Sequence, residues 1–192
     1  MSNILIDKER FISVDVETSG PNPTRYSLLS IGACRVFHPQ QTFYLEPKPV
    51  SLSFTPEALA SSGFSMDELA LNGVDPSEAM RRFETWLQEV LSREQRPVFV
   101  GFNAPFDWMF VTDYFHRFLG HNPFGHAAID IKSFYMGLSG VPWSETTMQY
   151  LGQRYLDRPA LIHHALRDAL DQGEIFRKLL LETGLHPGES QT

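Results

Sequence analysis

The chain is 192 residues long, which is enough for one sizeable domain with a hydrophobic core. Its content of 42% hydrophobic and 20% charged residues is typical of a soluble globular enzyme, and no apolar run approaches the ~20 residues that a membrane span needs. The formal net charge of −7 argues against a protein that coats nucleic acid through excess Lys and Arg. Cys34 is the single cysteine, which excludes an internal disulfide; because the N-terminal residues also lack a secretory signal, we expect a cytoplasmic protein.

Three short strands are predicted in quick succession near the start of the chain. In residues 11–16 apolar and polar side chains alternate, which is the period of a strand. Residues 27–37 and 41–46 are predicted as the second and third strands. Because the segments between them leave no room for helices, we expect these strands to pair antiparallel.

Helices and two further strands are predicted downstream. A capping side chain stands directly before a proline at Thr55 and again at Asp75, which predicts that a short and a longer helix begin there. The longer helix carries an apolar stripe formed by Met80, Phe83, Leu87, Val90 and Leu91. The remaining predicted elements are strands over residues 97–102 and 127–131, a helix into which residues 103–107 lead, and helices over residues 146–154 and 163–183. We therefore expect one α/β domain over residues 1–183 and a flexible tail over residues 184–192.

Two acidic residues, Asp15 and Glu17, occupy alternate positions of the first predicted strand. Residues two apart on a strand point to the same face, so these carboxylates would lie side by side. Close carboxylates repel each other and lose hydration unless a cation lies between them. The alternative interpretation is the hydrated face of an edge strand, but the turn over residues 19–23 follows directly and favours a site at the end of the strand.

A third acidic residue, Asp107, follows soon after the predicted strand 97–102. A carboxylate just past the end of a strand is placed at the rim where α/β active sites form. The competing interpretation is an acidic residue in the first turn of a helix, where the helix dipole favours negative charge. By itself, this motif favours the competing interpretation.

The segment HHALRD, residues 163–168, places two histidines near a fourth carboxylate. On an ideal helix His164 and Asp168 are four residues apart and share a face, whereas His163 and Asp168 are separated by roughly 140°. His163 approaches Asp168 only if it lies at the entry to the helix. Helix geometry alone therefore selects His164, and the simplest interpretation is a surface His–Asp pair.

Together these motifs resemble the DEDDh 3′→5′ exonucleases, which include RNase T, oligoribonuclease and the proofreading subunit of bacterial replicative polymerase. The motif residues are Asp15, Glu17 and Thr18 of D-x-E-T, Asn103 with Phe106 and Asp107 of the second motif, and His163, Ala165 and Asp168 of H-x-A-x-x-D. The third motif selects His163 over His164. Residues 56–60, 72–76 and 122–124 look like RNase T in particular.

The resemblance implies an RNase H-like fold: a mixed five-stranded sheet, its first three strands antiparallel, flanked by helices. It also implies two divalent ions, Mg²⁺ or Mn²⁺, and the four carboxylates would form an oxygen-rich site that suits these ions better than Zn²⁺. We assign Asp15 to both ions, Glu17 and Asp168 to the ion that holds the attacking water, and Asp107 to the other ion. His163 is expected to take the proton from that water, and the product to be a nucleoside 5′-monophosphate from the 3′ end.

Contacts to the substrate are predicted at Thr18, Asn103, Phe106 and Phe124. The two phenylalanines would stack on bases of a single-stranded 3′ end. The competing interpretation is that both belong to the core, because the chain has 15 phenylalanines. The expected substrate is DNA or RNA with a free 3′ end, and RNA trimming as by RNase T, polymerase proofreading and degradation of very short oligonucleotides all stay open.

The sequence departs from RNase T where that enzyme carries aromatic residues, because Pro21 and Ser61 stand at these positions. This departure weakens the prediction of RNase T-like substrate preference. A different class of function is an inactive relative that binds nucleic acid, although the complete set of five motif residues argues against it. Several relatives are dimers, so a homodimer is a candidate assembly, and no membrane partner is expected.

Overall fold

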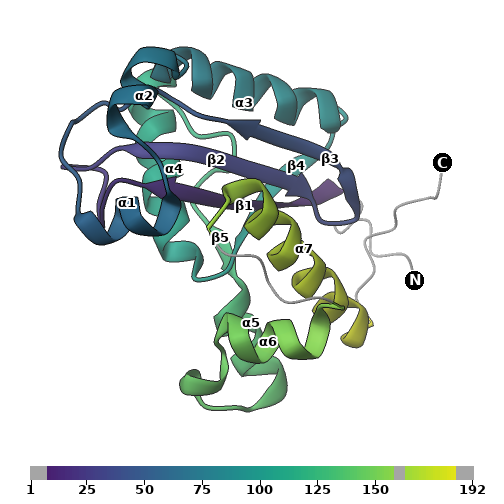
Figure 1. The fold of residues 1–192 in the computed structure, drawn as a ribbon. Helices are drawn as coiled ribbons and strands as arrows, with labels where there is room; N and C mark the ends of the chain where they lie inside the picture. Colours follow the sequence, from purple (N-terminus) through teal and green to yellow (C-terminus); the bar gives the residue numbers. More distant parts are fainter. Residues whose placement is uncertain (1–7, 158–162, 185–192) are drawn as a thin grey trace.

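The computed structural model describes residues 8–157 and 163–184, which form a mixed five-stranded sheet flanked by helices (Figure 1). The strands are β1 (Glu9–Thr18), β2 (Leu28–Arg35), β3 (His38–Leu45), β4 (Arg96–Gly101) and β5 (Ala128–Asp130). Their order across the sheet is β3-β2-β1-β4-β5, with antiparallel pairing among the first three strands and parallel pairing of β4 with β1 and of β5 with β4. The predicted fold class is confirmed, and β1 lies at the centre of the sheet.

The helices cover both faces of this sheet. They are α1 (Pro56–Ser62), α2 (Met66–Asn72), α3 (Pro76–Val90), α4 (Ala104–Leu119), α5 (Ile131–Ser139), the 3₁₀ helix η2 (Trp143–Glu145), α6 (Met148–Tyr155) and α7 (Ala165–Glu182). The predicted helix starts at Thr55 and Asp75 are confirmed, because both side chains accept hydrogen bonds from backbone N–H groups of the first turn. Within the described ranges, no helix is long and apolar enough to cross a membrane.

Two α-helices and the 3₁₀ helix η2 were not predicted, and all three are short. Helix α2 has seven residues and α5 has nine, which is too few for an apolar period to stand out. Helix α5 begins behind Asp130, whose carboxylate caps it, so the predicted strand over 127–131 ends where this helix begins. Of the predicted tail, residues 185–192 lie outside the described residues.

The core consists of two main apolar layers, one on each face of the sheet. One layer joins β1 to α3 and α4, and its largest buried side chains are Phe83, Phe99, Phe110, Tyr114 and Phe115. The other joins the sheet to α5, α6 and α7 through Val100, Tyr135, Leu151, Ile175, Phe176 and Leu179. In Figure 1 α7 crosses in front of the sheet, α4 lies behind it, and α5 and α6 extend below it. Strand β1 is therefore covered on both faces.

Candidate active site

Strand β1 places Asp15 and Glu17 on the face that α7 covers. Val14 and Val16, which alternate with these two residues, are buried in the aromatic layer formed with α3 and α4. The alternation predicted from the sequence is therefore confirmed. Ser13, on the same face as the two acidic residues, donates a hydrogen bond to the carbonyl oxygen of Ala169 in α7 at 2.7 Å. The two carboxylates thus lie between a central strand and a helix rather than on an exposed edge.

Helix α4 brings Asp107 to the same strand from the other side. The chain enters this helix through Asn103, whose left-handed backbone (φ 65°) is one that asparagine tolerates better than most residues. Asp107 is buried, and its Oδ1 accepts the backbone N–H of Val16 at 3.0 Å. This hydrogen bond holds Asp107 next to the backbone that joins Asp15 to Glu17, so the carboxylate does more than serve the helix dipole.

Helix α7 brings Asp168 close to Asp15 because small residues line the contact. Ala165 and Ala169 are fully buried against the sheet. Gly32 lies opposite Asp15 in the β1–β2 ladder, and a Cβ atom there would stand only 2.2 Å from the backbone of Ala165. A larger side chain at Gly32 or at Ala165 would push the first turn of α7 away from the sheet. The close contact with β2 therefore explains why the H-x-A-x-x-D motif has a small residue, alanine, at this position.

A further residue, Gln172, anchors α7 in the region of the site and was missed by the sequence analysis. Its side-chain Nε2 donates to the carbonyl oxygen of Val14 at 2.8 Å, and its Oε1 accepts the backbone N–H of Phe102 at 2.5 Å. The parallel pairing of β1 with β4 ends at Ser13 and Val100, so this buried amide bridges the two strands just where they separate. The available signal was its spacing of four residues from Asp168, which puts both on one face of α7.

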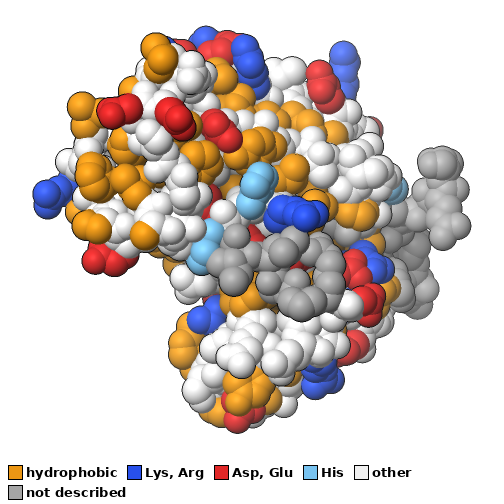
Figure 2. Space-filling model, viewed as in Figure 1, with side chains coloured by type: hydrophobic (Ala, Val, Ile, Leu, Met, Phe, Trp, Pro, Cys, Tyr) orange, Lys and Arg blue, Asp and Glu red, His pale blue; other side chains and the backbone are white. Residues whose placement is uncertain are grey.

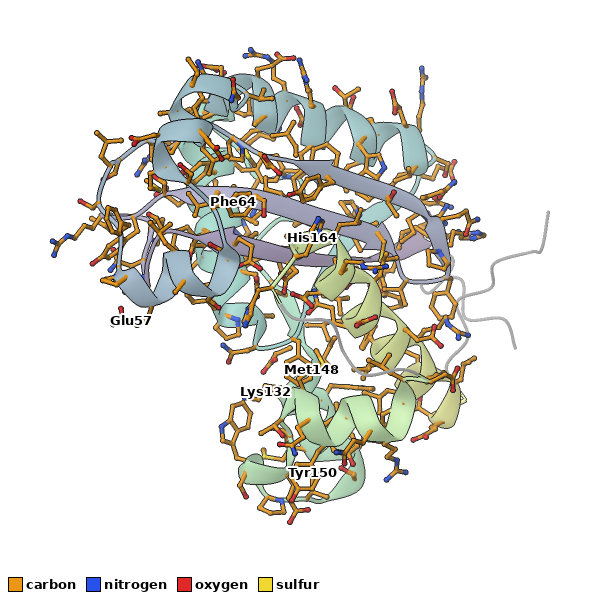
Figure 3. All side chains as sticks on the ribbon, in the orientation of Figure 1. Glu57, Phe64, Lys132, Met148, Tyr150 and His164 are labelled. Atoms are coloured by element: carbon orange, nitrogen blue, oxygen red, sulfur yellow. The ribbon has the colours of Figure 1, made fainter. Side chains whose placement is uncertain are left out.

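The two histidines of the third motif have different surroundings. His164 stacks on the ring of Tyr44 in β3, with the ring centroids 4.8 Å apart, and Figure 3 shows it over the sheet where α7 begins. Asp168 accepts the backbone N–H of His164 at 3.1 Å, so the contact between these residues involves the main chain. His163 lies before the helix with a left-handed backbone (φ 62°), and its charge acts on Asp168. This is the helix-entry position that the H-x-A-x-x-D interpretation requires.

Burial raises the pKa of all four carboxylates, and repulsion between them adds to the effect at Asp15, Glu17 and Asp107. Burial, followed by repulsion from Asp168, raises the pKa of Glu17 to about 7. Burial also raises the pKa of Asp107 to about 8, against the opposing effect of the Val16 N–H. The pKa of Asp15 lies well above its usual range, because of burial first and then of the charges on Asp107, Asp168 and Glu17. Holding these groups ionised near neutral pH therefore costs free energy unless a cation compensates the charge.

The arrangement of the carboxylates fits a divalent cation. Asp15, Glu17 and Asp168 each offer one oxygen, and these three oxygens lie within 4.8 Å of one another. In the described part of the chain, no Lys or Arg forms an ion pair with them or with Asp107. Hard oxygen ligands of this kind are those that Mg²⁺ and Mn²⁺ prefer.

A cavity of about 290 Å³ opens beside these carboxylates. Its wall includes Glu17 and Thr18 from β1, Ser61 from α1 and Phe106 from α4. Thr18 donates its hydroxyl proton to the carbonyl oxygen of Gly20 at 3.0 Å, which leaves its oxygen lone pairs as acceptors. The structure thus brings two of the four predicted substrate contacts, Thr18 and Phe106, to one wall next to Glu17.

The other two predicted substrate contacts lie elsewhere. Phe124 is 7% exposed and packs against Phe83, Phe99 and Phe115, with ring centroids 5.3–6.3 Å apart. A ring in this position belongs to the core and has little surface to offer a base. Asn103 is exposed at the start of α4, where its backbone N–H donates to the carboxylate of Asp130. Its contribution visible in the structure is the turn that leads into α4.

A central strand with two carboxylates, joined by one carboxylate from each of two helices, on an RNase H-like sheet defines a metal-dependent nuclease. An exonuclease family model matches residues 12–176, and the chain belongs to this family, the DEDDh 3′→5′ exonucleases. It is similar to the 3′-5′ DNA exonuclease Cap18 of Escherichia coli, with 48% identity over 171 residues, 89% of this chain and 91% of that protein.

Solved structures show the same fold at low sequence identity. The nuclease domain of 3′hExo, a DEDDh family member bound to rAMP, superposes with a TM-score of 0.71 at 15% identity and covers 91% of this chain and 92% of that one. E. coli exonuclease I in complex with a dT13 oligonucleotide gives a TM-score of 0.72 at 16% identity, over 92% of this chain and 42% of that one.

Proposed function

We propose that this exonuclease removes nucleoside 5′-monophosphates one at a time from the 3′ end of single-stranded DNA, with two Mg²⁺ or Mn²⁺ ions. The observation that carries the proposal is the convergence of Asp15, Glu17 and Asp168, whose carboxylate oxygens lie within 4.8 Å of one another. DNA is favoured over RNA because the relative at 48% identity is named a DNA exonuclease.

The four carboxylates divide into two sets. Asp15, Glu17 and Asp168 would hold one ion, and Asp15 with Asp107 the other. When bound, two such ions stabilise the charge that develops on the scissile phosphate and lower the pKa of the attacking water. Asp107 is suited to act as a metal ligand with a fixed orientation, because the Val16 N–H already holds its carboxylate in place.

His163 would accept the proton of the attacking water. It is exposed at the entry to α7 and lies close enough to Asp168 for their charges to interact, so it stands near one of the carboxylates that would hold an ion. The ordinary pKa of histidine lies near neutral pH, which suits a general base. His164 is less suited to this role, because its ring is stacked on Tyr44.

The 3′-terminal nucleotide would occupy the cavity beside Glu17. The Phe106 ring can stack on the terminal base. Thr18 can accept a hydrogen bond from the 3′ hydroxyl, since its own proton is donated to Gly20. A terminus that carries a 3′ phosphate lacks this donor and adds negative charge beside Glu17, so a free 3′ hydroxyl would be required.

The test is digestion of matched 5′-labelled DNA and RNA oligonucleotides and of a closed circular single strand, with Mn²⁺ or with EDTA. We expect a ladder that shortens from the 3′ end, nucleoside 5′-monophosphate as product, faster loss of DNA than of RNA, and no cutting of the circle. Asp15→Asn is the matched control for contaminating nuclease. Activity in EDTA would contradict the metal mechanism, cutting of the circle would contradict the exonuclease mode, and DNA binding without cleavage would identify an inactive relative.

A further inference from the structure

The α5–α6 lobe, residues 131–155, exposes several large apolar side chains. Met136, Leu138 and Trp143 are all exposed. In Figure 2 hydrophobic side chains are visible at the surface of this lobe, below the main body of the molecule. Exposed apolar groups that gather on one part of a surface mark a site of interaction.

The best-defined feature of the lobe is a pair formed by Lys132 and Trp143. The Lys132 Nζ atom lies 4.1 Å from the centroid of the indole ring, in a cation–π contact. Trp143 is 49% exposed, so about half of its surface stays accessible. Among the described residues, Lys132 forms no ion pair, and its ammonium group has three hydrogen atoms to donate. The pair therefore combines an orientated aromatic face with an available positive charge.

This pair is joined to the active site through Asp130. The Asp130 carboxylate accepts the backbone N–H of Lys132 at 3.3 Å and, from the neighbouring helix, that of Asn103 at 3.1 Å. The same carboxylate thus ties the first turn of α5 to the start of α4, whose first turn carries Phe106 and Asp107. Figure 3 shows Lys132, like Met148, on the part of the lobe that lies toward the main body, below His164. The start of α5 is accordingly held beside the start of α4, the helix that carries Asp107.

We propose that Lys132 and Trp143 form a contact site for the substrate strand, on the 5′ side of the terminal nucleotide. This inference rests on the proposed function, because it takes single-stranded nucleic acid as the substrate. Lys132 donates to a backbone phosphate, and the accessible part of the indole stacks on a base. Positive charge at this point also offsets the repulsion between an anionic strand and a protein of net charge −7.

The test compares Lys132→Gln and Trp143→Ala with the wild type on two substrates. One is a 5′-labelled 15-mer of oligothymidylate, and the other is the p-nitrophenyl ester of thymidine 5′-monophosphate, which has no upstream strand. For the 15-mer we expect KM to rise by roughly 5- to 20-fold, the usual scale for loss of one stacked base or phosphate contact. Both kcat and hydrolysis of the ester should stay within about 2-fold, because the carboxylates are untouched. Trp143→Phe, which keeps an aromatic face, should lie between the wild type and Trp143→Ala.

Two further measurements sharpen the test. The slope of log KM against log salt concentration should fall by about 0.7 in Lys132→Gln, the value for one phosphate contact to a single strand. Tyr150→Ala and Arg93→Ala are matched controls, one an exposed aromatic residue on α6 and the other a cation in the turn after α3. Both should leave KM unchanged.

The outcomes separate this inference from the proposed function. If the wild type cleaves both substrates and the two variants match it on the 15-mer, the contact site is wrong and the proposed function stands. If the wild type cleaves neither substrate, the proposed function itself fails. An unchanged KM together with a change in molar mass by light scattering would assign the surface to a second copy of the chain and would also overturn the inference.

Discussion

The helices α4 and α7 each bring one carboxylate to β1, but they are attached to the sheet by different means. Helix α4 packs through large buried rings, and one of these, Tyr114, accepts the backbone N–H of Leu28 with its hydroxyl oxygen. The first half of α7, which carries Asp168, rests on the strands through Ala165, Ala169 and Gly173, which let the backbones approach closely. Its second half packs through larger side chains such as Phe176. Its carboxylate, Asp168, is only partly buried, whereas Asp107 is buried and hydrogen-bonded to the strand.

The positions of Asp107 and Asp168 therefore depend on different parts of the fold. Asp107 is held by a deep aromatic layer and a direct hydrogen bond, so its position is part of the core. Asp168 and His163 lie where α7 begins, and their position depends on how closely that first turn approaches β2. We therefore expect changes near α4 to act on folding stability as well as activity, and changes near the start of α7 to act mainly on metal binding and catalysis.

Replacement of the two carboxylates should give the largest effects. Asn or Ala at either Asp107 or Asp168 should lower kcat by roughly 10³-fold or more, because a lost metal ligand removes several kcal/mol of transition-state stabilisation. Stability should distinguish them. Both Asn and Ala remove the charge, but only Asn keeps a side-chain oxygen that can accept the backbone hydrogen bond. The difference in unfolding free energy between the Asn and Ala variants should therefore be about 1–3 kcal/mol at Asp107 and below about 1 kcal/mol at Asp168. Urea titration in EDTA measures it, and equal differences would remove the contrast between the two helices.

The two adjacent histidines should come next in magnitude. His163→Ala should reduce kcat by roughly 10²–10⁴-fold, the usual contribution of a positioned proton acceptor, and leave Mn²⁺ affinity nearly intact. His164→Ala loses the contact with Tyr44 and should cost about 10-fold at most. Single-turnover rates and Mn²⁺ titration check both variants. If His164→Ala proves the more impaired of the two, the simple helix-face interpretation was right and the family motif misleads at this position.

Gly32→Ala tests the close approach of α7 without changing any predicted metal ligand. The new Cβ would meet the backbone of Ala165 and Leu166 at 2.2 Å, so the first turn of the helix has to move. We expect a loss of about 1–3 kcal/mol in unfolding free energy. A displacement of about 1 Å at Asp168 should also cost on the order of 10²-fold in rate. Gly137→Ala, on α5, is the matched control, because a Cβ there meets nothing within 4 Å. Unchanged Mn²⁺ affinity in Gly32→Ala would show that the site does not depend on this contact.

The smallest predicted effect is a pH dependence of stability without metal. Burial and mutual repulsion raise the pKa of Glu17 to about 7 and that of Asp107 to about 8. Between its ordinary pKa and this raised value, each group is protonated in the folded state and ionised in the unfolded state, so stability falls as pH rises through this range and levels off above it. In EDTA we expect Tm to fall by roughly 5 °C from pH 5 to pH 8. Saturating Mn²⁺ should reverse the trend, because ionised carboxylates bind the ion, and a Tm in EDTA that rises over this range would contradict the raised pKa values.

Local sequence patterns correctly predicted the features that depend only on residues close together in the chain. The alternation in β1 correctly placed Asp15 and Glu17 opposite the buried Val14 and Val16. The caps at Thr55 and Asp75 correctly marked two helix starts. Three antiparallel strands followed from the lack of room for helices between them. Each of these conclusions depends on the period of a strand or on the donors of a first helical turn, which are local properties of the chain.

The α/β class could thus be predicted from local patterns, and the family motifs indicated the RNase H-like fold and the candidate catalytic residues. How these residues meet follows from tertiary packing, because each contact that positions them joins residues far apart in the chain. Three contacts are of this kind. Val16 donates a hydrogen bond to Asp107, Ala165 packs closely against Gly32, and Gln172 bridges β1 and β4. The same holds for Phe124, which three aromatic rings enclose in the core although its motif suggested a substrate contact. Close packing of distant segments, which no local period encodes, places all of these side chains.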